Sequence, residues 1–386
     1  MHPPNHRYYF DWAAAAIPDA GIAAPPGALP FGNPSSPYLE GRKAREALED
    51  AHHRCAVVLG LPPKSIYFTS GGTESNAIVI HSFLLRRTGG RFLYSAVEHP
   101  SVRENCAVLA RLGKQTGIIP VEADGRISME TIGRSLEKYP DARFAAIMAV
   151  NNETGAVMDM AAIGAELRSR SAGRPPVHLH CDMVQAVGKI PIDLSGWEVD
   201  SAALSAHKIG GPRGIGLLYL RRPLETVYSG GGQEGGIRPG TENTAGALAL
   251  ADCLERHGTA EKATEAYGAA ARRMKKLIRG LASMERCALI PADRGENDGR
   301  FSPWIVQAAF DGIPGEVMVR ALDEAGFAIS TGSACSSAKA ERPVLAAMGI
   351  DNRKSLEGIR ISQGWSTTDE EIDLLIEAIR GVLKFL

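Results

Sequence analysis

The strongest constraint on the fold is an alternation of helix-like and strand-like segments between about residues 37 and 220. Such alternation is typical of a parallel or mostly parallel sheet that is covered by helices. The strand-like runs are Ile66–Thr69, Arg91–Ser95, Phe144–Val150, Val177–Asp182, Ala202–Ser205 and Gly216–Leu220. The helix-like segments are Leu39–Leu59, Thr73–Leu85, Pro100–Leu112, Met129–Lys138 and Met160–Ser171.

The C-terminal part of the chain has a different pattern. After a glycine-rich segment, a helical stretch begins at Thr241 and continues to about Gly280. Beyond it, strands and helices mix, which indicates a smaller α+β domain. We therefore expect an α/β fold with a large domain at residues 18–255 and a small α+β domain formed by residues 1–17 with residues 256–386. The strands expected there are Trp304–Phe310, Gly326–Ser330 and Ile359–Ser362, and the helices are Gly315–Ala325, Val344–Met348 and Thr368–Lys384.

Charge and hydropathy argue against several classes of function. The chain has 386 residues with 43 basic and 44 acidic side chains, so its net charge of −1 gives no electrostatic attraction toward nucleic acid or an anionic membrane. Its longest apolar runs are far too short to span a bilayer. The N-terminus lacks the basic-then-apolar pattern of a signal peptide. We expect a cytoplasmic protein that binds neither nucleic acid nor membrane.

Two strand-like runs lead into residues that the chemistry of pyridoxal 5′-phosphate (PLP) requires. One run ends on Asp182, and another leads into His207 and Lys208. A PLP enzyme needs a lysine that holds the cofactor aldehyde as an imine, and an acid that keeps the pyridine nitrogen protonated. Strand ends of a parallel sheet are a usual place for such groups. The structural alternatives are a carboxylate that caps a turn and a solvated surface lysine.

A glycine turn between a strand and a helix predicts a phosphate site. Gly71 and Gly72 follow the run Ile66–Thr69 and open the next helical stretch. Such a turn exposes backbone N–H groups at a helix N-terminus, where an anion is stabilised. A plain helix cap by Thr73 or Ser75 explains the same residues nearly as well.

The six cysteines show no spacing typical of a zinc site or of a disulfide framework. Cys335 stands out because it lies in a run of small residues, from Ser330 to Ala338, that cannot anchor a hydrophobic core. We expect an exposed loop there with a reactive thiol, and the alternative is an exposed cysteine without a role. The other five have mostly apolar or helix-like neighbours and are expected to be inert core thiols: Cys55, Cys106, Cys181, Cys253 and Cys287.

Several ordered motifs identify a family. The chain resembles the fold-type I PLP enzymes of aminotransferase class V, and within these the cysteine desulfurases of the NifS/IscS type. The resemblance covers nearly the whole chain. The motifs that carry it are Gly32–Ser36, Thr69–Asn76, Glu98-His99, Val150–Gly155, Asp182–Gln185, Ser205–Lys208, Gly210–Gly214, Arg238–Thr241 and Thr331–Ser337.

The resemblance implies a role for each matching residue around the cofactor ring. Lys208 would bind the cofactor aldehyde, Asp182 would pair with the pyridine nitrogen, and Gln185 would hydrogen-bond the ring hydroxyl. His99 would stack on the ring and help to move protons. Cys335 would be the nucleophile that takes the sulfur.

Further implied contacts concern the phosphate and the substrate. Asn152 and Arg360 would receive the substrate carboxylate, with Asn152 also near the cofactor. Thr241 would reach the phosphate of the neighbouring subunit, which implies a homodimer. The phosphate contacts within one chain would be Gly72, Thr73, Ser205 and His207.

The chemistry of an imidazole and of an arginine suits these tasks. His99 stands just before the helix start at Pro100, where a plain capping histidine is the alternative. Its flat ring favours offset stacking, and its pKa suits proton transfer near neutrality. Arg360 lies in an alternating strand-like run, where an outward-facing arginine is the commoner case. Its planar fork matches a carboxylate in a bidentate way that lysine cannot.

Three features depart from the family pattern. Tyr38 stands where a histidine is usual, and Ala13–Ala16 stand where threonines are common. In relatives the alanine segment borders the active site, so hydroxyl groups are lost there. The chain ends at Leu386, without the longer C-terminal tail by which housekeeping members engage the iron–sulfur scaffold protein. The acceptor is therefore open among such a scaffold, a tRNA thiolation enzyme and a cofactor pathway.

The activity implied by the resemblance is that of an L-cysteine desulfurase, which releases L-alanine and keeps the sulfur as a persulfide on Cys335. A selenocysteine lyase or another class V aminotransferase is the alternative on the same scaffold, and a transaminase would not need Cys335. The non-enzymatic alternative is a PLP-bearing subunit of a sulfur-transfer complex that turns over poorly alone.

Overall fold

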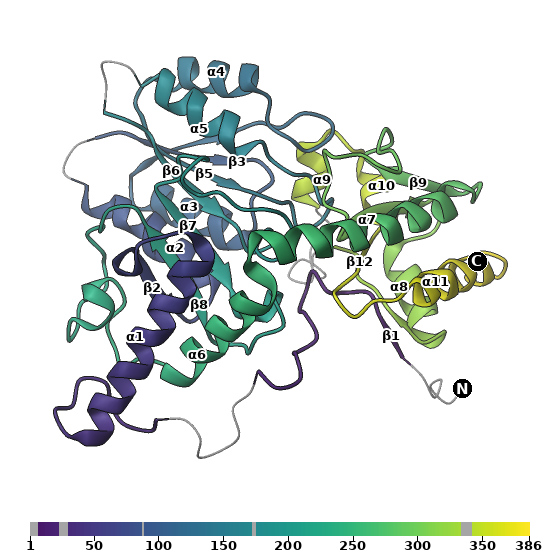
Figure 1. Cartoon of the computed structure of the whole chain (residues 1–386). Coiled ribbons are helices and arrows are strands. Elements are labelled where there is room, and N and C mark those ends of the chain that lie inside the picture. Colours follow the sequence, from purple (N-terminus) through teal and green to yellow (C-terminus); the bar gives the residue numbers. More distant parts are fainter. Residues whose placement is uncertain (1–6, 23–29, 87–88, 172–174, 333–341) are drawn as a thin grey trace.

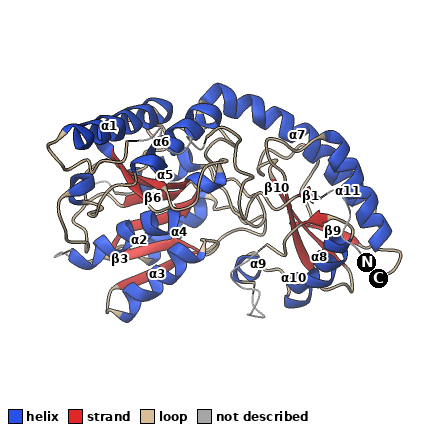
Figure 2. Cartoon of the chain, turned by 90° about the horizontal axis from the view of Figure 1, so that it is seen from below, coloured by secondary structure: helices blue, strands red, loops and turns tan. Residues whose placement is uncertain are grey.

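A seven-stranded sheet between helices forms the larger part of the molecule (Figure 1, Figure 2). The computed structural model describes residues 7–22, 30–86, 89–171, 175–332 and 342–386. The strand order is β2-β8-β7-β6-β5-β3-β4. The strands are β2 Ile66–Thr69, β3 Arg91–Ser95, β4 Gln115–Ile119, β5 Ala142–Met148, β6 His178–Asp182, β7 Ser201–Ser205 and β8 Gly216–Leu220.

The sheet is mostly parallel, as the sequence predicts. Only β8 runs antiparallel to its neighbours β2 and β7, and all the other pairs are parallel. The connection from β7 to β8, residues 206–215, is too short for the crossover that parallel pairing requires. The edge strand β4 was not predicted, because its sequence Gln-Thr-Gly-Ile-Ile is half polar or glycine.

Helices cover both faces of the sheet, and strand side chains alternate between the two layers. In β5, Phe144 and Ala146 pack in the core that includes helices α2 and α3, whereas Ala145 and Ile147 pack in the core that includes α1, α5 and α6. The helices of this part are α1 Leu39–Leu59, α2 Gly72–Ser82, α3 Pro100–Arg111, α4 Met129–Lys138, α5 Met160–Ser169 and α6 Thr244–Cys253.

A smaller part has its own sheets and core. An antiparallel sheet has the order β12-β10-β9, and β1 pairs in parallel with β11. Phe10, next to β1, packs in the core of this part. The separate sheets and cores support the predicted division near residue 255, which stays a prediction. The elements are β1 Tyr8–Tyr9, β9 Cys287–Ile290, β10 Ile305–Phe310, β11 Phe327–Ala328, β12 Gly358–Ser362, α7 Ala260–Ala282, α8 Gly315–Glu324, α9 Pro343–Ala347, α10 Asn352–Glu357 and α11 Asp369–Val382.

The predicted continuous helix from Thr241 to about Gly280 is wrong at its start and its middle. The helix begins at Thr244, and a π-helical turn at Leu254–Gly258 separates α6 from α7. Thr259 caps the restart by accepting a hydrogen bond from the Lys262 backbone N–H. The long helix α7 then extends from the larger part to the smaller one (Figure 1). No helix in the described part of the chain is both long and apolar enough to cross a membrane.

Candidate active site

A cavity of about 460 Å³ lies at the carboxyl edge of the parallel strands. Residues that follow β3, β5, β6 and β7 meet there, because the carboxyl ends of parallel strands share one edge of the sheet. Arg360 of β12 and Gly332 reach the same cavity from the smaller part. The predicted site residues that line it are Gly72, Thr73, His99, Asn152, Asp182, Gln185, Ser205, His207, Lys208 and Arg360.

Two described residues that the family comparison singled out, Thr241 and Tyr38, are not among the cavity's lining residues. Thr241 is exposed, so its contact with a neighbouring subunit stays a prediction. Tyr38 is exposed just before α1. Cys335 lies outside the described residues, but Gly332 and Pro343, on either side of its segment, both line the cavity.

Asp182 ends β6 and is 6% exposed. Its Oδ1 accepts a hydrogen bond from the Val184 backbone N–H at 3.0 Å, and its Oδ2 accepts one from Asn76 Nδ2 at 2.8 Å. A buried carboxylate is tolerated where such donors satisfy it. A role as a plain turn residue does not explain the whole position of Asp182, because this side chain also lines the cavity.

Lys208 and Gln185 both bind the backbone of the alanine segment. Lys208 Nζ donates to the carbonyl oxygens of Ala13 and Ala14 at 2.7 and 2.6 Å, and Gln185 Nε2 donates to Ala13 at 2.8 Å. The segment therefore borders the cavity, and it does so through backbone oxygens. These contacts do not depend on the hydroxyl groups that threonines would supply.

The start of α2 fits an anion. The alternative of a Thr73 or Ser75 cap is wrong, because no side chain caps this helix and the Ser75 hydroxyl bonds Thr69 Oγ1 at 2.8 Å. The first N–H groups of the helix are thus left for another acceptor. Gly72 also permits close packing, since a Cβ there would lie 2.7 Å from Val184 Cγ2.

Ser205 and His207 lie beside this helix start. Ser205 Oγ is 2.8 Å from His207 Nδ1, and a Cβ at Gly71 would lie 3.3 Å from Ser205 Oγ. Burial, together with the nearby Lys208 charge, lowers the pKa of His207 to about 4. His207 is therefore a neutral hydrogen-bonding group at physiological pH rather than a cation.

His99 is both a helix cap and a cavity residue. Its Nδ1 accepts a hydrogen bond from the Ser101 backbone N–H at 3.1 Å and lies 2.8 Å from Ser101 Oγ. Burial lowers the pKa of His99, and the Asp182 charge opposes that shift. The capping alternative is thus correct, and it leaves the ring on the cavity wall.

Arg360 lines the cavity and keeps part of its hydrogen-bonding capacity unused. Its Nη1 donates to the carbonyl oxygens of Asn152 and Gly332 at 2.8 and 3.0 Å, and its Nη2 donates to Asp11 Oδ1 at 2.7 Å. The buried Nε has no hydrogen-bond partner among the described residues, and neither has Asn152 Oδ1. The unpaired Nε–H is one arm of the fork with which an arginine binds a carboxylate.

Comparison with known proteins gives the family. Residues 9–375 match the family described as aminotransferase class-V. The chain belongs to this family. A NifS/IcsS protein homolog from Lactobacillus delbrueckii subsp. bulgaricus is 38% identical over 92% of this chain and 90% of its own length. Cysteine desulfurase IscS from Aeromonas hydrophila is 37% identical over 91% of this chain and 85% of its own length.

A solved structure agrees with these relatives. A NifS-like protein superposes with a TM-score of 0.88 at 30% identity, covering 98% of this chain and all of that one. The chain is thus a class V member of the NifS/IscS type. PLP is the cofactor that this membership implies. The uncapped start of α2 suits its phosphate, and the buried Asp182 carboxylate suits its pyridine nitrogen.

Several residues of this class V site were not assigned a role from the sequence. Asn76, Ser101 and Asp11 contact predicted site residues, and Glu98 lines the cavity. Asn76 and Glu98 stand inside the quoted motifs, so their position was visible but their contacts were not. The available signal for Asn76 was its place on the side of a predicted helix that faces the sheet, because a polar side chain buried there needs a hydrogen-bond partner.

Glu98 gives a pH-dependent stability that can be measured. It is 1% exposed, and burial, with a contribution from Asp182, raises its pKa to about 8. In the unfolded chain a glutamate titrates near pH ~4.3. Between these values the folded state keeps a proton that the unfolded state has lost, so this group lowers stability as pH rises.

Glu98→Gln should remove that loss, because glutamine keeps the acceptor for Ser95 Oγ and the Met148 N–H but carries no charge. We compare the melting temperatures of the variant and of wild type, both free of PLP. We expect the melting temperature of the variant to exceed that of wild type by more at about pH 8 than at about pH 5. Thermal unfolding of both proteins at the two pH values checks this. Parallel pH profiles would show that Glu98 has no raised pKa.

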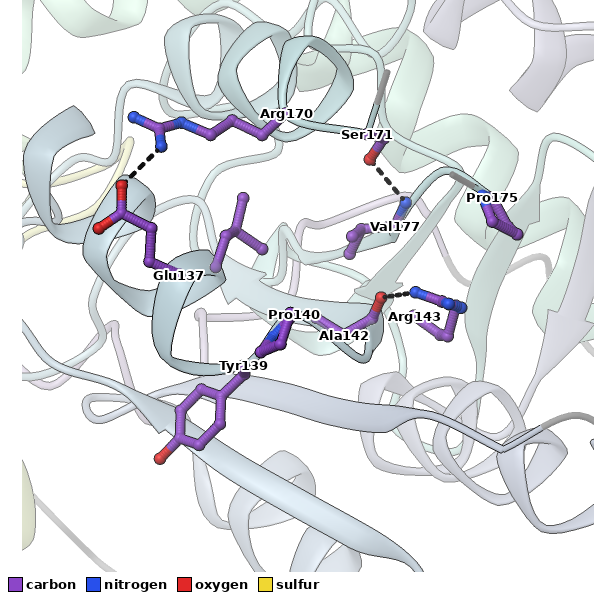
Figure 3. A pocket seen from close by; sticks show the side chains of 10 residues that line it. Glu137, Tyr139, Pro140, Ala142, Arg143, Arg170, Ser171, Pro175 and Val177 are labelled. Carbon is purple, nitrogen blue, oxygen red and sulfur yellow. Dashed lines mark hydrogen bonds and ion pairs between the residues drawn. The ribbon is translucent and has the colours of Figure 1, made fainter. Parts of the chain in front are cut away.

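A second hollow lies at the opposite edge of the sheet (Figure 3). Ala142 and Val177 line it at the amino ends of β5 and β6, and Arg170 pairs there with Glu137 at 2.9 Å. It contains none of the predicted site residues.

Proposed function

We propose that this protein is an L-cysteine desulfurase that binds PLP, releases L-alanine and keeps the sulfur as a persulfide on Cys335. One observation carries the proposal. A single cavity is lined by Lys208, Asp182, His99 and Arg360, whose Nε–H has no partner among the described residues, and by residues on both sides of the segment that contains Cys335. Relatives named cysteine desulfurase support the choice of substrate.

The chain's residues would share the work at the substrate Cα. Arg360 binds the substrate carboxylate and thereby fixes which Cα bond faces Lys208. The neutral Lys208 amine takes the Cα proton as a general base. PLP, when bound, supplies an electron sink for the charge that forms at Cα. Asp182 keeps a proton on the ring nitrogen, which sustains that sink.

Cleavage of the C–S bond would fall to Cys335 and His99. The Cys335 thiolate attacks the substrate sulfur, so that an S–S bond forms while the Cβ–S bond breaks. The electron pair of the broken bond stays with carbon, which is protonated and leaves as alanine. We assign the movement of this proton to His99, which lines the cavity.

The other cysteines are poor candidates for this step. Four are buried and Cys287 is half-buried, so the predicted core position is confirmed for the four. Burial raises the pKa of all five thiols, which lowers the fraction of reactive thiolate. They are Cys55, Cys106, Cys181, Cys253 and Cys287.

The proposal extends to assembly and delivery. A homodimer in which Thr241 reaches the phosphate of the neighbouring subunit suits the exposed position of Thr241 on this chain. A sulfur-acceptor protein would then collect the persulfide. The cytoplasmic location expected from the sequence stays a prediction.

Arg360→Ala should weaken the binding of L-cysteine while PLP content stays that of wild type. Loss of a charge-assisted contact costs about 1.5–3 kcal/mol, or roughly one to two decades in KM. Steady-state kinetics and cofactor absorbance measure both quantities. Arg360→Lys is the matched control, because it keeps the charge but not the fork, and we expect an intermediate KM. A wild-type KM in Arg360→Ala would place the carboxylate site elsewhere.

The purified, PLP-loaded protein tests the function when L-cysteine and L-selenocysteine are offered separately. Alanine from L-cysteine together with protein persulfide is the expected result. Alanine from L-selenocysteine alone would favour a lyase, and amino transfer to a keto acid without persulfide would favour an aminotransferase. No turnover until a partner protein is added would favour the sulfur-transfer subunit.

A further inference from the structure

Asn76 is a fully buried asparagine that links two predicted catalytic groups. Its Nδ2 donates to Asp182 Oδ2 and to Ser101 Oγ, each at 2.8 Å. Its Oδ1 lies 2.9 Å from His180 Nε2. Asn76 stands on α2, Ser101 on α3, and both Asp182 and His180 on β6, so one amide joins three elements and uses both protons and its oxygen.

The hydrogen bonds around Asn76 have one consistent direction. A carboxylate only accepts, so Asn76 turns its nitrogen toward Asp182 and its oxygen toward His180. His180 then donates from Nε2, which leaves its Nδ1 to accept from Ser201 Oγ at 2.8 Å. Burial lowers the pKa of His180 to about 3, which agrees with a neutral ring that carries one proton.

His99 is fixed by the same cluster. Ser101 Oγ accepts from Asn76, so its own proton goes to His99 Nδ1 at 2.8 Å. The Ser101 backbone N–H donates to that same nitrogen at 3.1 Å. The proton of the neutral His99 ring must therefore lie on Nε2, the nitrogen that is not engaged by Ser101.

We propose that Asn76 is a positioning residue that orients the Asp182 carboxylate and, together with the Ser101 backbone N–H, holds neutral His99 as the Nε2–H tautomer. The role rests on the proposed function, in which both residues handle protons. As this tautomer, His99 offers the cavity a proton donor rather than an acceptor. Protonation of the substrate carbon after sulfur leaves is the step that needs a donor.

The decisive comparison is Asn76→Ala with Ser82→Ala. The control removes a buried hydroxyl from the same helix, where Ser82 Oγ donates only to the Val79 carbonyl oxygen at 2.7 Å. Histidine-selective ¹⁵N NMR reads the His99 tautomer in PLP-free protein, with the signal assigned by its loss in His99→Gln. We expect Nε2–H alone in wild type and in Ser82→Ala. In Asn76→Ala the Ser101 hydroxyl is free to accept from Nδ1, and only the Ser101 backbone N–H still opposes that tautomer, so we expect some Nδ1–H beside Nε2–H.

Kinetics of the PLP-loaded proteins give the second readout. We expect kcat for alanine release to fall roughly 10- to 100-fold in Asn76→Ala, the range known for the loss of outer hydrogen-bond partners that orient metal ligands. The KM for L-cysteine should stay within about twofold, because the Arg360 fork is untouched. Ser82→Ala should keep both constants.

A second pair of variants decides the matter if Asn76→Ala does not fold. His180→Gln can replace the donor that faces Asn76 Oδ1, whereas His180→Leu leaves Oδ1 buried without a donor, which weakens the hold of the amide on Ser101. We expect the wild-type tautomer in His180→Gln and a mixture in His180→Leu. The proposal is overturned if the Nε2–H tautomer alone is found in Asn76→Ala. If Asn76→Ala does not fold, the same finding in His180→Leu overturns it. A shifted tautomer in a protein that forms no alanine would support the positioning role and reject the proposed function.

Discussion

Lys208→Ala should abolish alanine release and leave PLP without a covalent bond to the chain. The Lys208 amine is the group assigned both to hold the cofactor aldehyde and to take the Cα proton, so no other residue is expected to replace it. The general-base contribution alone is worth about 10²–10⁴-fold in rate. Borohydride reduction followed by peptide mapping measures the attachment, and alanine release measures the rate.

Lys189 supplies the matched control for this variant. It is 2% exposed, its Nζ donates to Gln185 Oε1 at 2.8 Å, and burial lowers its pKa to about 7. An amine with so low a pKa, this close to the site, is the best rival for the aldehyde. We expect Lys189→Met to leave the trapped cofactor on Lys208. Cofactor trapped on another peptide of the Lys208→Ala variant would contradict the assignment.

Cys335→Ala should stop alanine release while L-cysteine still changes the visible absorbance of the bound cofactor. Cys335 is assigned only to the attack on sulfur, so substrate binding and proton removal at Cα do not need it. Loss of a nucleophile should lower turnover on the order of 10³-fold or more. Absorbance after addition of L-cysteine and alanine formation are measured on the same sample.

Cys287→Ala is the control for the loss of a thiol. Cys287 is half-buried, and burial raises its pKa to about 12. We expect this variant to keep alanine release and persulfide formation. Full alanine release by Cys335→Ala would reject the desulfurase mechanism, whereas alanine with persulfide on a different cysteine would reject only the residue.

The sheet and the site were predictable because both follow from regular patterns. Apolar runs alternating with helical segments indicate a parallel sheet, and the polar residues that end those runs must then meet at one edge. Asp182 and Lys208 were found in this way, Asp182 from its place at the end of β6 and Lys208 from its place after β7. The family resemblance extended the prediction to His99, Gln185 and Arg360, all of which line the cavity.

Features that depend on contacts between distant segments were not predictable. The sequence does not show that the backbone oxygens of Ala13 and Ala14 accept from Lys208, because backbone groups are the same at every position. Asp11 pairs with Arg360 across 349 positions of the chain. The break between α6 and α7 was hidden because helix-forming residues stand on both sides of it.

Asn76 shows the same limit within a quoted motif. Its place after Ser75 on α2 was known, but its three partners come from β6 and α3. Periodicity indicates which side of a helix faces the sheet, whereas the partner of a buried amide depends on the register of the packed elements. Polar residues on a buried helix face are therefore positions where the structure adds most to the sequence.

The most direct test of the central claim is a single turnover of sulfur-labelled L-cysteine by the purified, PLP-loaded protein without reductant. Alanine and protein-bound sulfur are quantified together, and the protein is then digested. The proposed function predicts about one alanine and one bound sulfur per chain, with the label on the peptide that contains Cys335. Alanine formed without any label on the protein, or no alanine at all, would contradict it.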